Sequence, residues 1–139
     1  METFELQIVT PEKQIVQTRA VSLTAPGAEG ELGILAKHAP MIAELVGGEL
    51  FYRTADEEHR LAIAGGFLFV KHSRVSVLAE SADLVSEISA EKTRLELERA
   101  KGDLAKSSSG IEILQAEAAL KRALAQLRVY ASLQRRKKT

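Results

Sequence analysis

Residues 89–134 read SAEKTRLELERAKGDLAKSSSGIEILQAEAALKRALAQLRVYASLQ, and this stretch decides the fold. Apolar and small residues recur in it at steps of three and four, both before and after the run of serines. That spacing places them on one stripe of each of two helices. The stripes consist of Ala90, Thr93, Leu97, Ala100 and Leu104 in the first helix, and of Ile113, Ala116, Leu120, Ala123, Leu127 and Tyr130 in the second.

The segment Lys106–Gly110 predicts a tight connection between these helices. Serine competes for backbone hydrogen bonds and favours helix ends, and we expect Gly110 to adopt a positive φ there. Ser89 is the expected N-cap of the first helix. Because the connection is short, the two helices are predicted to be antiparallel. Their stripes are rich in alanine and bury little apolar area, so a pair of this kind is held loosely unless it rests on another element.

The preceding part of the chain has the period of β-structure. Phe4–Ile8 alternates apolar and polar residues, which is typical of a half-buried strand, and Val75–Ala79 is expected to be the last strand. Between them, short apolar segments are separated by turn residues such as Gly47-Gly48 and Gly65-Gly66. Short strands with frequent turns favour a sandwich or a barrel over alternating strands and helices. The period changes to a helical one at Ala82–Glu87.

We therefore predict an α+β protein with two units. Residues 1–85 form an antiparallel β-sandwich, and residues 86–139 form an antiparallel two-helix hairpin. The chain has 139 residues without cysteine or asparagine, which excludes disulfides, thiolate chemistry and N-glycosylation. No apolar run is long enough to cross a bilayer and no signal-peptide pattern opens the chain, so we expect a cytosolic or peripheral membrane protein.

Charge is balanced overall but unevenly distributed. The sequence has 19 Lys and Arg against 19 Asp and Glu, yet no acidic residue follows Glu117. A basic arm on a neutral protein favours an acidic partner surface, and the alternative is a solvated helix face with a frayed end. The basic residues of this arm are Lys121, Arg122, Arg128, Arg135, Arg136, Lys137 and Lys138.

No group of residues has the spacing of a catalytic or metal site. The three histidines lie in turn-like stretches without a second ligand at a suitable distance along the chain. The glycines of Gly27–Gly33 resemble a phosphate loop, but no Lys-Ser/Thr follows them, and we interpret them as hairpin glycines. Phe51, Phe67 and Phe69 favour core packing over base stacking, because no basic residues alternate with them.

Two classes of function remain compatible with these patterns. The first is a regulatory or connecting subunit with a β body for attachment and a helical arm for control. The second is a non-enzymatic nucleic-acid-binding or adaptor module that uses the basic arm. A nucleic-acid binder usually spreads its basic residues over a groove or a sheet face, whereas here they lie at one end of one helix.

Three segments in order resemble a known family. Gly30–Pro40 (GELGILAKHAP) is similar to the central signature of the ε subunit of F-type ATP synthase. Gly65-Gly66-Phe67, followed by Val75–Glu80, is similar to its later strands, and Ala118–Val129 to its second helix. The resemblance runs from about Phe4 to Ala131 and implies a sandwich of ten short strands followed by a helical hairpin.

The resemblance also implies a non-catalytic subunit in the central stalk of the rotary enzyme, coupling catalysis to proton flow. Its sandwich would bind the γ subunit and the ring of c subunits, with Glu31 and His38 at the foot of the stalk. Its arm would inhibit ATP hydrolysis by extending between the catalytic α and β subunits. Arg122 and Arg128 would then bind an acidic segment of the catalytic β subunits, and the residues Arg135–Lys138 would assist. It implies a peripheral position on the cytoplasmic face of the plasma (inner) membrane, reached through the complex, and no nucleic-acid partner.

Some members of this family bind ATP through a motif Ile-Asp-x-x-Arg-Ala at the start of the first helix. The corresponding residues here are Ile88–Thr93, and only Ile88 matches. Ser89 replaces the carboxylate, and Lys92 keeps the charge without the planar guanidinium. Arg99 and Arg122 could still meet phosphates together with Lys92 in a closed hairpin. We predict no cofactor and weak or absent ATP binding.

Overall fold

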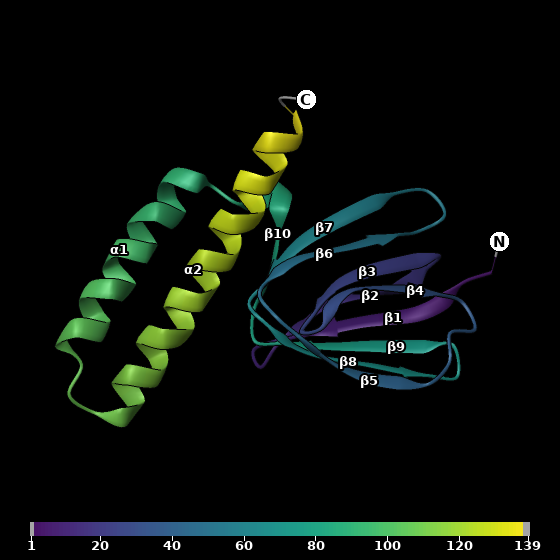
Figure 1. Ribbon diagram of the computed structural model, residues 1–139, viewed down its shortest axis with the longest axis horizontal. Helices are drawn as coiled ribbons and strands as arrows, with labels where there is room; N and C mark the ends of the chain where they lie inside the picture. The colour runs from purple at the N-terminus through teal and green to yellow at the C-terminus, as the bar shows by residue number, and fades with distance from the viewer. Residues whose placement is uncertain (1, 138–139) are drawn as a thin grey trace.

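A computed structural model describes residues 2–137, which form a β-sandwich beside a helical hairpin (Figure 1). The strands are β1 (Phe4–Val9), β2 (Gln14–Ala20), β3 (Ser22–Gly27), β4 (Gly30–Leu35), β5 (Met41–Leu45), β6 (Gly48–Arg53), β7 (Glu58–Ile63), β8 (Gly66–Lys71), β9 (Arg74–Ala79) and β10 (Ala82–Leu84). The helical elements are a 3-10 turn, η1 (Val85–Glu87), and the helices α1 (Ala90–Lys106) and α2 (Gly110–Lys137).

The strands are joined in the order β10-β7-β6-β3-β5-β8-β9-β1-β2, with β4 paired to β3. All pairs are antiparallel except β1 and β9, which run parallel. Alternate residues of each strand point inward, as in β1, where Phe4, Leu6 and Ile8 are buried. The inward residues form one apolar core between the two layers, to which Leu23, Leu50, Leu61, Leu68, Val75 and Val77 also belong. The predicted sandwich and hairpin are confirmed.

One glycine of the predicted Gly65-Gly66 turn is required by close packing. Gly66 has a φ of 149°, and a Cβ atom there would lie 2.0 Å from the carbonyl oxygen of Leu78 on the neighbouring strand. No side chain fits at that distance, so the backbone of β8 approaches β9 this closely only with glycine.

The segment after β9 differs from the prediction. The helical period was expected to begin at Ala82, but Ala82–Leu84 form β10, which pairs antiparallel with β7. Three residues are too few to separate a period of two from one of 3.6. The edge of β7 offers unpaired backbone groups there, and hydrogen bonds with them decide the conformation.

Both helices begin at a serine cap. The Oγ atom of Ser89 accepts a hydrogen bond from the backbone N–H of Lys92 at 3.3 Å, as predicted. The Oγ atom of Ser109 accepts one from the N–H of Glu112 at 3.1 Å. Gly110 is therefore the first residue of α2 and does not have a positive φ, so the expectation for this glycine was wrong. The serine run, rather than the glycine, forms the connection.

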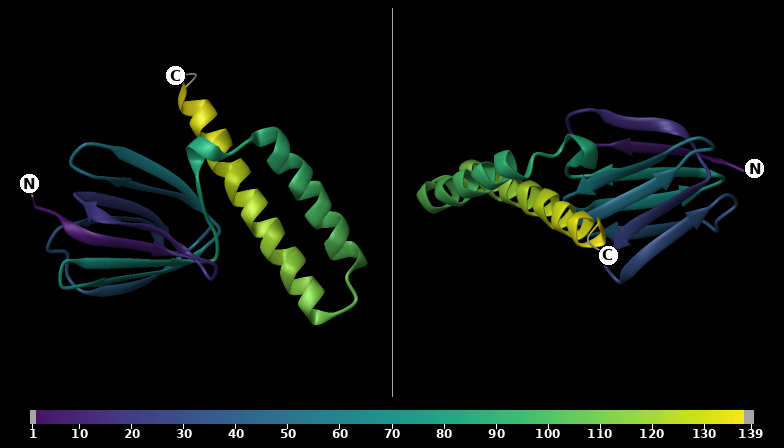
Figure 2. Two further views of the ribbon diagram at one scale, coloured as in Figure 1. Left: turned by 180° about the vertical axis from the view of Figure 1, so that it is seen from behind. Right: turned by 90° about the horizontal axis from the view of Figure 1, so that it is seen from above.

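The second helix lies between α1 and the sandwich (Figures 1 and 2). The seam between α1 and α2 contains the buried side chains of Thr93, Ala100, Ala116 and Ala123, all of which belong to the predicted stripes. On its other side α2 packs against β6 and β7. The arm, which we define as α1 and α2, is therefore attached to the body mainly through α2.

Candidate functional site

The junction between the arm and the sandwich is built from a second face of α2. Ala125 and Val129 are buried there, although neither belongs to the stripe predicted from the sequence. Gly47, at the turn before β6, lies beside the guanidinium of Arg128, and a Cβ atom there would be 3.8 Å from Nη1. This face was missed because its only strongly apolar member is Val129, and alanines occur all around this part of the helix.

A bidentate ion pair joins α2 to the end of the sandwich. Arg122 donates from Nε to Oδ2 of Asp83 at 3.0 Å and from Nη2 to Oδ1 at 2.6 Å. Two parallel hydrogen bonds between a guanidinium and a carboxylate fix both the distance and the orientation of the groups. Arg122 was predicted to meet an acidic partner, and in this conformation the acidic group belongs to β10 of the same chain.

The electrostatics of Asp83 reflect opposing contributions. Burial alone would raise the pKa of its carboxyl, but hydrogen bonds from Arg122 and Gln126 and the charge of Arg122 outweigh burial and hold the pKa below its usual 3.8. The hydrogen bonds with Asp83 in turn raise the pKa of Arg122. The pair is therefore fully ionised at neutral pH.

Two further arginines, nearer the C-terminal end of α2, also contact the sandwich. Arg128 donates from Nη1 to the backbone carbonyl of Gly47 at 3.1 Å, and Arg136 donates from Nη2 to Oε2 of Glu49 at 2.6 Å. The other oxygen of Glu49 accepts from Arg60 of β7, also at 2.6 Å. Lys138, the last residue of the predicted basic tail, lies outside the described residues, as does the side chain of Lys137.

A buried polar pair connects the two helices of the arm close to the ion pair of Arg122 and Asp83. The hydroxyl of Thr93 on α1 donates to Oε1 of Gln126 on α2 at 3.0 Å, and both side chains are buried. Gln126 also helps to hold Asp83, so one residue links α1, α2 and β10. The sequence provides no signal for Gln126, because a single glutamine between alanines has no characteristic spacing.

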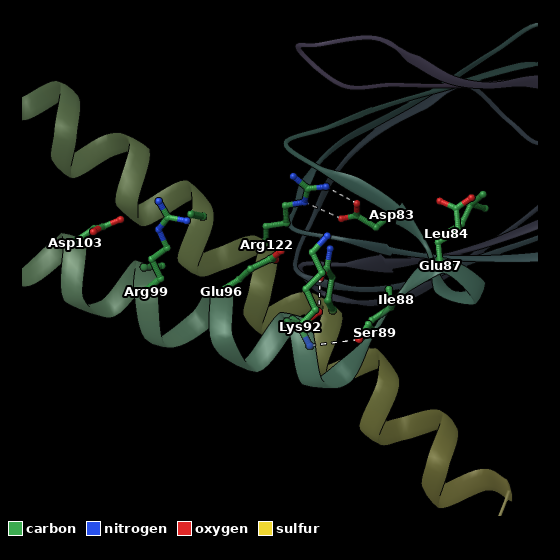
Figure 3. A pocket seen from close by; sticks show the side chains of 14 residues that line it. Asp83, Leu84, Glu87, Ile88, Ser89, Lys92, Glu96, Arg99, Asp103 and Arg122 are labelled. Carbon is green, nitrogen blue, oxygen red and sulfur yellow. Dashed lines mark hydrogen bonds and ion pairs between the residues drawn. The ribbon is translucent and has the colours of Figure 1, made fainter.

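The three residues predicted for weak ATP contact line one groove (Figure 3). The groove has a volume of ≈650 Å³ and lies between α1, α2 and residues 83–89. Its charged lining consists of Lys92, Arg99 and Arg122 together with four carboxylates, Asp83, Glu87, Glu96 and Asp103. The acidic side chains outnumber the basic ones, and the guanidinium of Arg122 is already paired.

Glu31 and His38 lie apart from the arm, in or after β4. Glu31 is exposed and lines a groove of ≈470 Å³ between the β3–β4 hairpin and β5. His38 is half-buried in the following loop, with Nδ1 2.7 Å from the carbonyl oxygen of Ala39. Glu31 is the second residue of β4 and His38 lies beyond its last residue, so the two side chains occupy opposite ends of the strand.

An apolar patch covers the outer face of β5, β8 and β9. Ile42 is 72% exposed and Phe67 is 49% exposed, and Leu78 is directly opposite Phe67 in the sheet. The expectation that Phe51, Phe67 and Phe69 pack in the core was therefore wrong. Phe67 and Phe69 take outward positions of β8, and Phe51 is half-buried beneath the guanidinium of Arg60. Three exposed large apolar side chains on one sheet face indicate a protein contact.

Within residues 2–137, no cluster of histidine and carboxylate side chains has the arrangement of a metal site. Over the same range, neither α1 nor α2 carries the apolar stretch that a membrane-spanning helix needs.

Two family models match the chain. The model "ATP synthase, Delta/Epsilon chain, beta-sandwich domain" matches residues 3–104, and "ATP synthase, Delta/Epsilon chain, long alpha-helix domain" matches residues 86–131. The chain belongs to the ATP synthase delta/epsilon family. It is thus a regulatory, non-catalytic subunit of an ATP synthase complex and a peripheral component of it.

Relatives in this delta/epsilon family match over nearly the whole chain. The ATP synthase epsilon chain of Moorella thermoacetica is 40% identical over 92% of this chain and 96% of its own length. That of Desulforapulum autotrophicum is 42% identical over the same shares. The sodium ion specific epsilon chain of Propionigenium modestum is 35% identical over 93% of this chain and 94% of its own length.

Chains in two solved structures are similar to this one in fold. A chain in the cryo-EM structure of the Euglena gracilis mitochondrial ATP synthase, OSCP/F1/c-ring, matches with a TM-score of 0.67 and 26% identity, over 94% of this chain and 81% of that one. A chain of the Tetrahymena thermophila mitochondrial enzyme matches in fold, with a TM-score of 0.58 and 15% identity over 91% of this chain and 97% of that one. The alternative of a nucleic-acid-binding or adaptor module is not supported.

The lowered pKa of Asp83 predicts that acid weakens the attachment of the arm. A carboxyl released from Arg122 regains its usual pKa and binds more protons than the paired one, so the pair stabilises the protein above about pH 4 and this contribution is lost as the pH falls further. The difference in free energy of unfolding between wild type and Asp83→Asn, from denaturant titration, is expected to be larger at pH 7 than at pH 3. The same difference at both pH values would contradict this assignment.

Proposed function

We propose that this chain works in the central stalk of the ATP synthase, coupling catalysis to proton flow, with the sandwich as an anchor and the arm as a regulator that slows ATP hydrolysis. The observation that carries this proposal is the attachment of the arm: three arginines of α2 hold it to the surface of a sandwich that has its own apolar core. An arm attached in this way can leave the body without exposing that core.

The boundary between the two proposed units lies at residues 85 and 86. The first unit, 1–85, would bind the γ subunit and the c-ring, and the second, 86–139, would be the regulatory arm. The similar Euglena chain belongs to an assembly of OSCP, F1 and the c-ring, which supports these partners for the present chain. The complex would place the chain on the cytoplasmic face of the inner membrane.

The apolar patch of Ile42, Phe67 and Leu78 is the surface that we assign to γ. It is exposed in the isolated chain and lies on the outer face of a sheet, where a partner can cover it without disturbing the core. Glu31 and His38 are assigned to the c-ring. Because they lie at opposite ends of β4, the c-ring contact would have to extend along this strand to include both.

Placing a charge in the apolar patch is expected to weaken the contact with γ. Phe67→Glu leaves an unpaired carboxylate in the proposed interface, and loss of a central aromatic contact typically weakens binding roughly tenfold or more. Co-purification with γ measures the effect. Asp56→Lys changes the charge of an exposed turn between β6 and β7 and serves as the control. Equal recovery of γ with both variants would rule out this surface.

Removal of residues 89–139 is expected to speed ATP hydrolysis by the reconstituted complex. We propose that Arg122 and Arg128 bind an acidic segment of the catalytic β subunits when the arm extends, with the following basic residues assisting. Regulatory couplings of this kind usually change an equilibrium by about fivefold or more. The effect is expected to shrink at high salt, because exposed charges are screened. Hydrolysis rates that do not depend on residues 89–139 would refute the regulatory role.

The groove between the helices is expected to bind ATP weakly or not at all. Its volume is sufficient for a nucleotide, but a triphosphate would meet four carboxylates, and Arg122 would have to leave Asp83. We expect isothermal titration calorimetry to give a dissociation constant weaker than about 1 mM. A variant with Ser89→Asp, Lys92→Arg and Thr93→Ala restores the family motif and is expected to bind more tightly. A micromolar constant for the wild-type chain would refute the prediction.

A further inference from the structure

Two of the basic residues assigned to an external acidic surface, Arg122 and Arg136, are bound to carboxylates of the sandwich in this conformation. Arg122 uses both Nε and Nη2 on the two oxygens of Asp83. Arg136 uses Nη2 on Glu49. A guanidinium engaged in two parallel bonds cannot form the same two bonds with another carboxylate, so the internal and external contacts exclude each other.

We propose that Asp83 and Glu49 act as an internal competitor, which occupies the arginine face of α2 and thereby withholds the arm from its acidic partner. This inference rests on the proposed regulatory role of the arm. It adds that carboxylates on the body, outside the arm itself, determine how readily the arm is released.

The two carboxylates belong to strands of the body, and the arginines belong to α2 of the arm. The side chains of Asp83 and Glu49 are 17% and 20% exposed, whereas those of Arg122 and Arg136 are 52% and 49% exposed. Glu49 is held by Arg60 of the body, whereas the hydrogen-bond partners of Asp83 in the docked state, Arg122 and Gln126, both belong to α2.

Glu49 is fixed by a second arginine on the body. Arg60 donates from Nη1 to Oε1 of Glu49 at 2.6 Å, and its guanidinium carbon lies 4.2 Å from the ring centre of Phe51. Glu49 therefore keeps a cationic partner after the arm has left. Asp83, in contrast, loses both hydrogen bonds from Arg122 when the arm leaves, and among the described residues no arginine of the body is bonded to it. We infer that Asp83 contributes more to docking than Glu49.

The apolar contribution between these two pairs is small. On this face of α2, between Arg122 and Arg136, Ala125 and Val129 are buried and Leu133, one turn further on, is half-buried. One alanine methyl and one valine side chain bury little area compared with leucines. The charged pairs therefore add to a limited apolar contact at both ends of this face.

Substitutions on the arm cannot test this inference cleanly. Replacing Arg122 removes the contact with the body and the proposed contact with the partner together, so the two effects oppose each other. Substitutions on the body remove only the internal contact. The sharp test uses Asp83→Asn and Glu49→Gln, alone and together, because both keep the shape of the side chain.

The position of the arm is measured first, in the full-length isolated chain. Since the chain has no cysteine, a nitroxide pair at Asp56→Cys and Ala131→Cys reports the distance between the body and α2. We expect the undocked fraction to rise roughly tenfold in the double variant, less in Asp83→Asn, and least in Glu49→Gln. Glu58→Gln is the matched control. It removes an exposed ion pair between Arg53 of β6 and Glu58 of β7, which does not involve the arm, and no change in the undocked fraction is expected.

ATP hydrolysis by the reconstituted complex is measured second, with the same variants and without labels. If the inference is correct, Asp83→Asn and the double variant inhibit hydrolysis more strongly than wild type, and Glu58→Gln does not. An arm that stays docked in all variants would overturn the inference and leave the proposed function intact. An arm that is released without any change in hydrolysis would also overturn the inference, by removing the regulatory role on which it rests.

Discussion

The ion pair between Arg122 and Asp83 is the contact on which the arrangement of the molecule depends. It joins the middle of α2 to β10, the last strand of the sandwich, and lies at the wall of the groove between the two helices. Its carboxylate belongs to a strand of the body, and its guanidinium belongs to a helix of the arm. The position of the arm relative to the body is therefore determined by a contact between charges, whose strength depends on pH, on salt and on competing carboxylates.

The rest of the attachment is weak enough for such a contact to matter. The seam between α1 and α2 is formed largely by alanines, each of which contributes roughly 0.8 kcal/mol per buried methyl, compared with about 1.5–3 kcal/mol for a buried leucine. The body, in contrast, has a core of phenylalanine, leucine, isoleucine and valine side chains contributed by strands from both layers. A regulatory element needs two states separated by only a few kcal/mol, and this distribution of apolar residues meets that requirement for the arm while leaving the body stable.

The sequence was sufficient to predict the features that depend on periodicity and local chemistry. Alternation in Phe4–Ile8 and the three-and-four spacing after Ser89 predicted the strands and the helices, and Ser89 is the cap that its side chain suggested. Contacts between distant residues were not predictable in the same way. The pairing of Arg122 with Asp83, the role of Gln126 and the docking face of Ala125 and Val129 depend on how α2 lies on β6 and β7, for which the pattern of apolar residues provides no information. The same applies to β10, whose three residues form a strand because β7 has a free edge beside them.

The mechanism requires that the body stays folded when the arm is removed. Denaturant unfolding of residues 1–88, compared with the full chain, measures that stability. If the sandwich has its own complete core, the shortened chain unfolds in one cooperative transition. The denaturant concentration at its midpoint is then close to the concentration at which the strands unfold in the full chain. A shortened chain that is unfolded or aggregated in the absence of denaturant would show that the helices are part of the core, and the mechanism of a releasable arm would then be wrong.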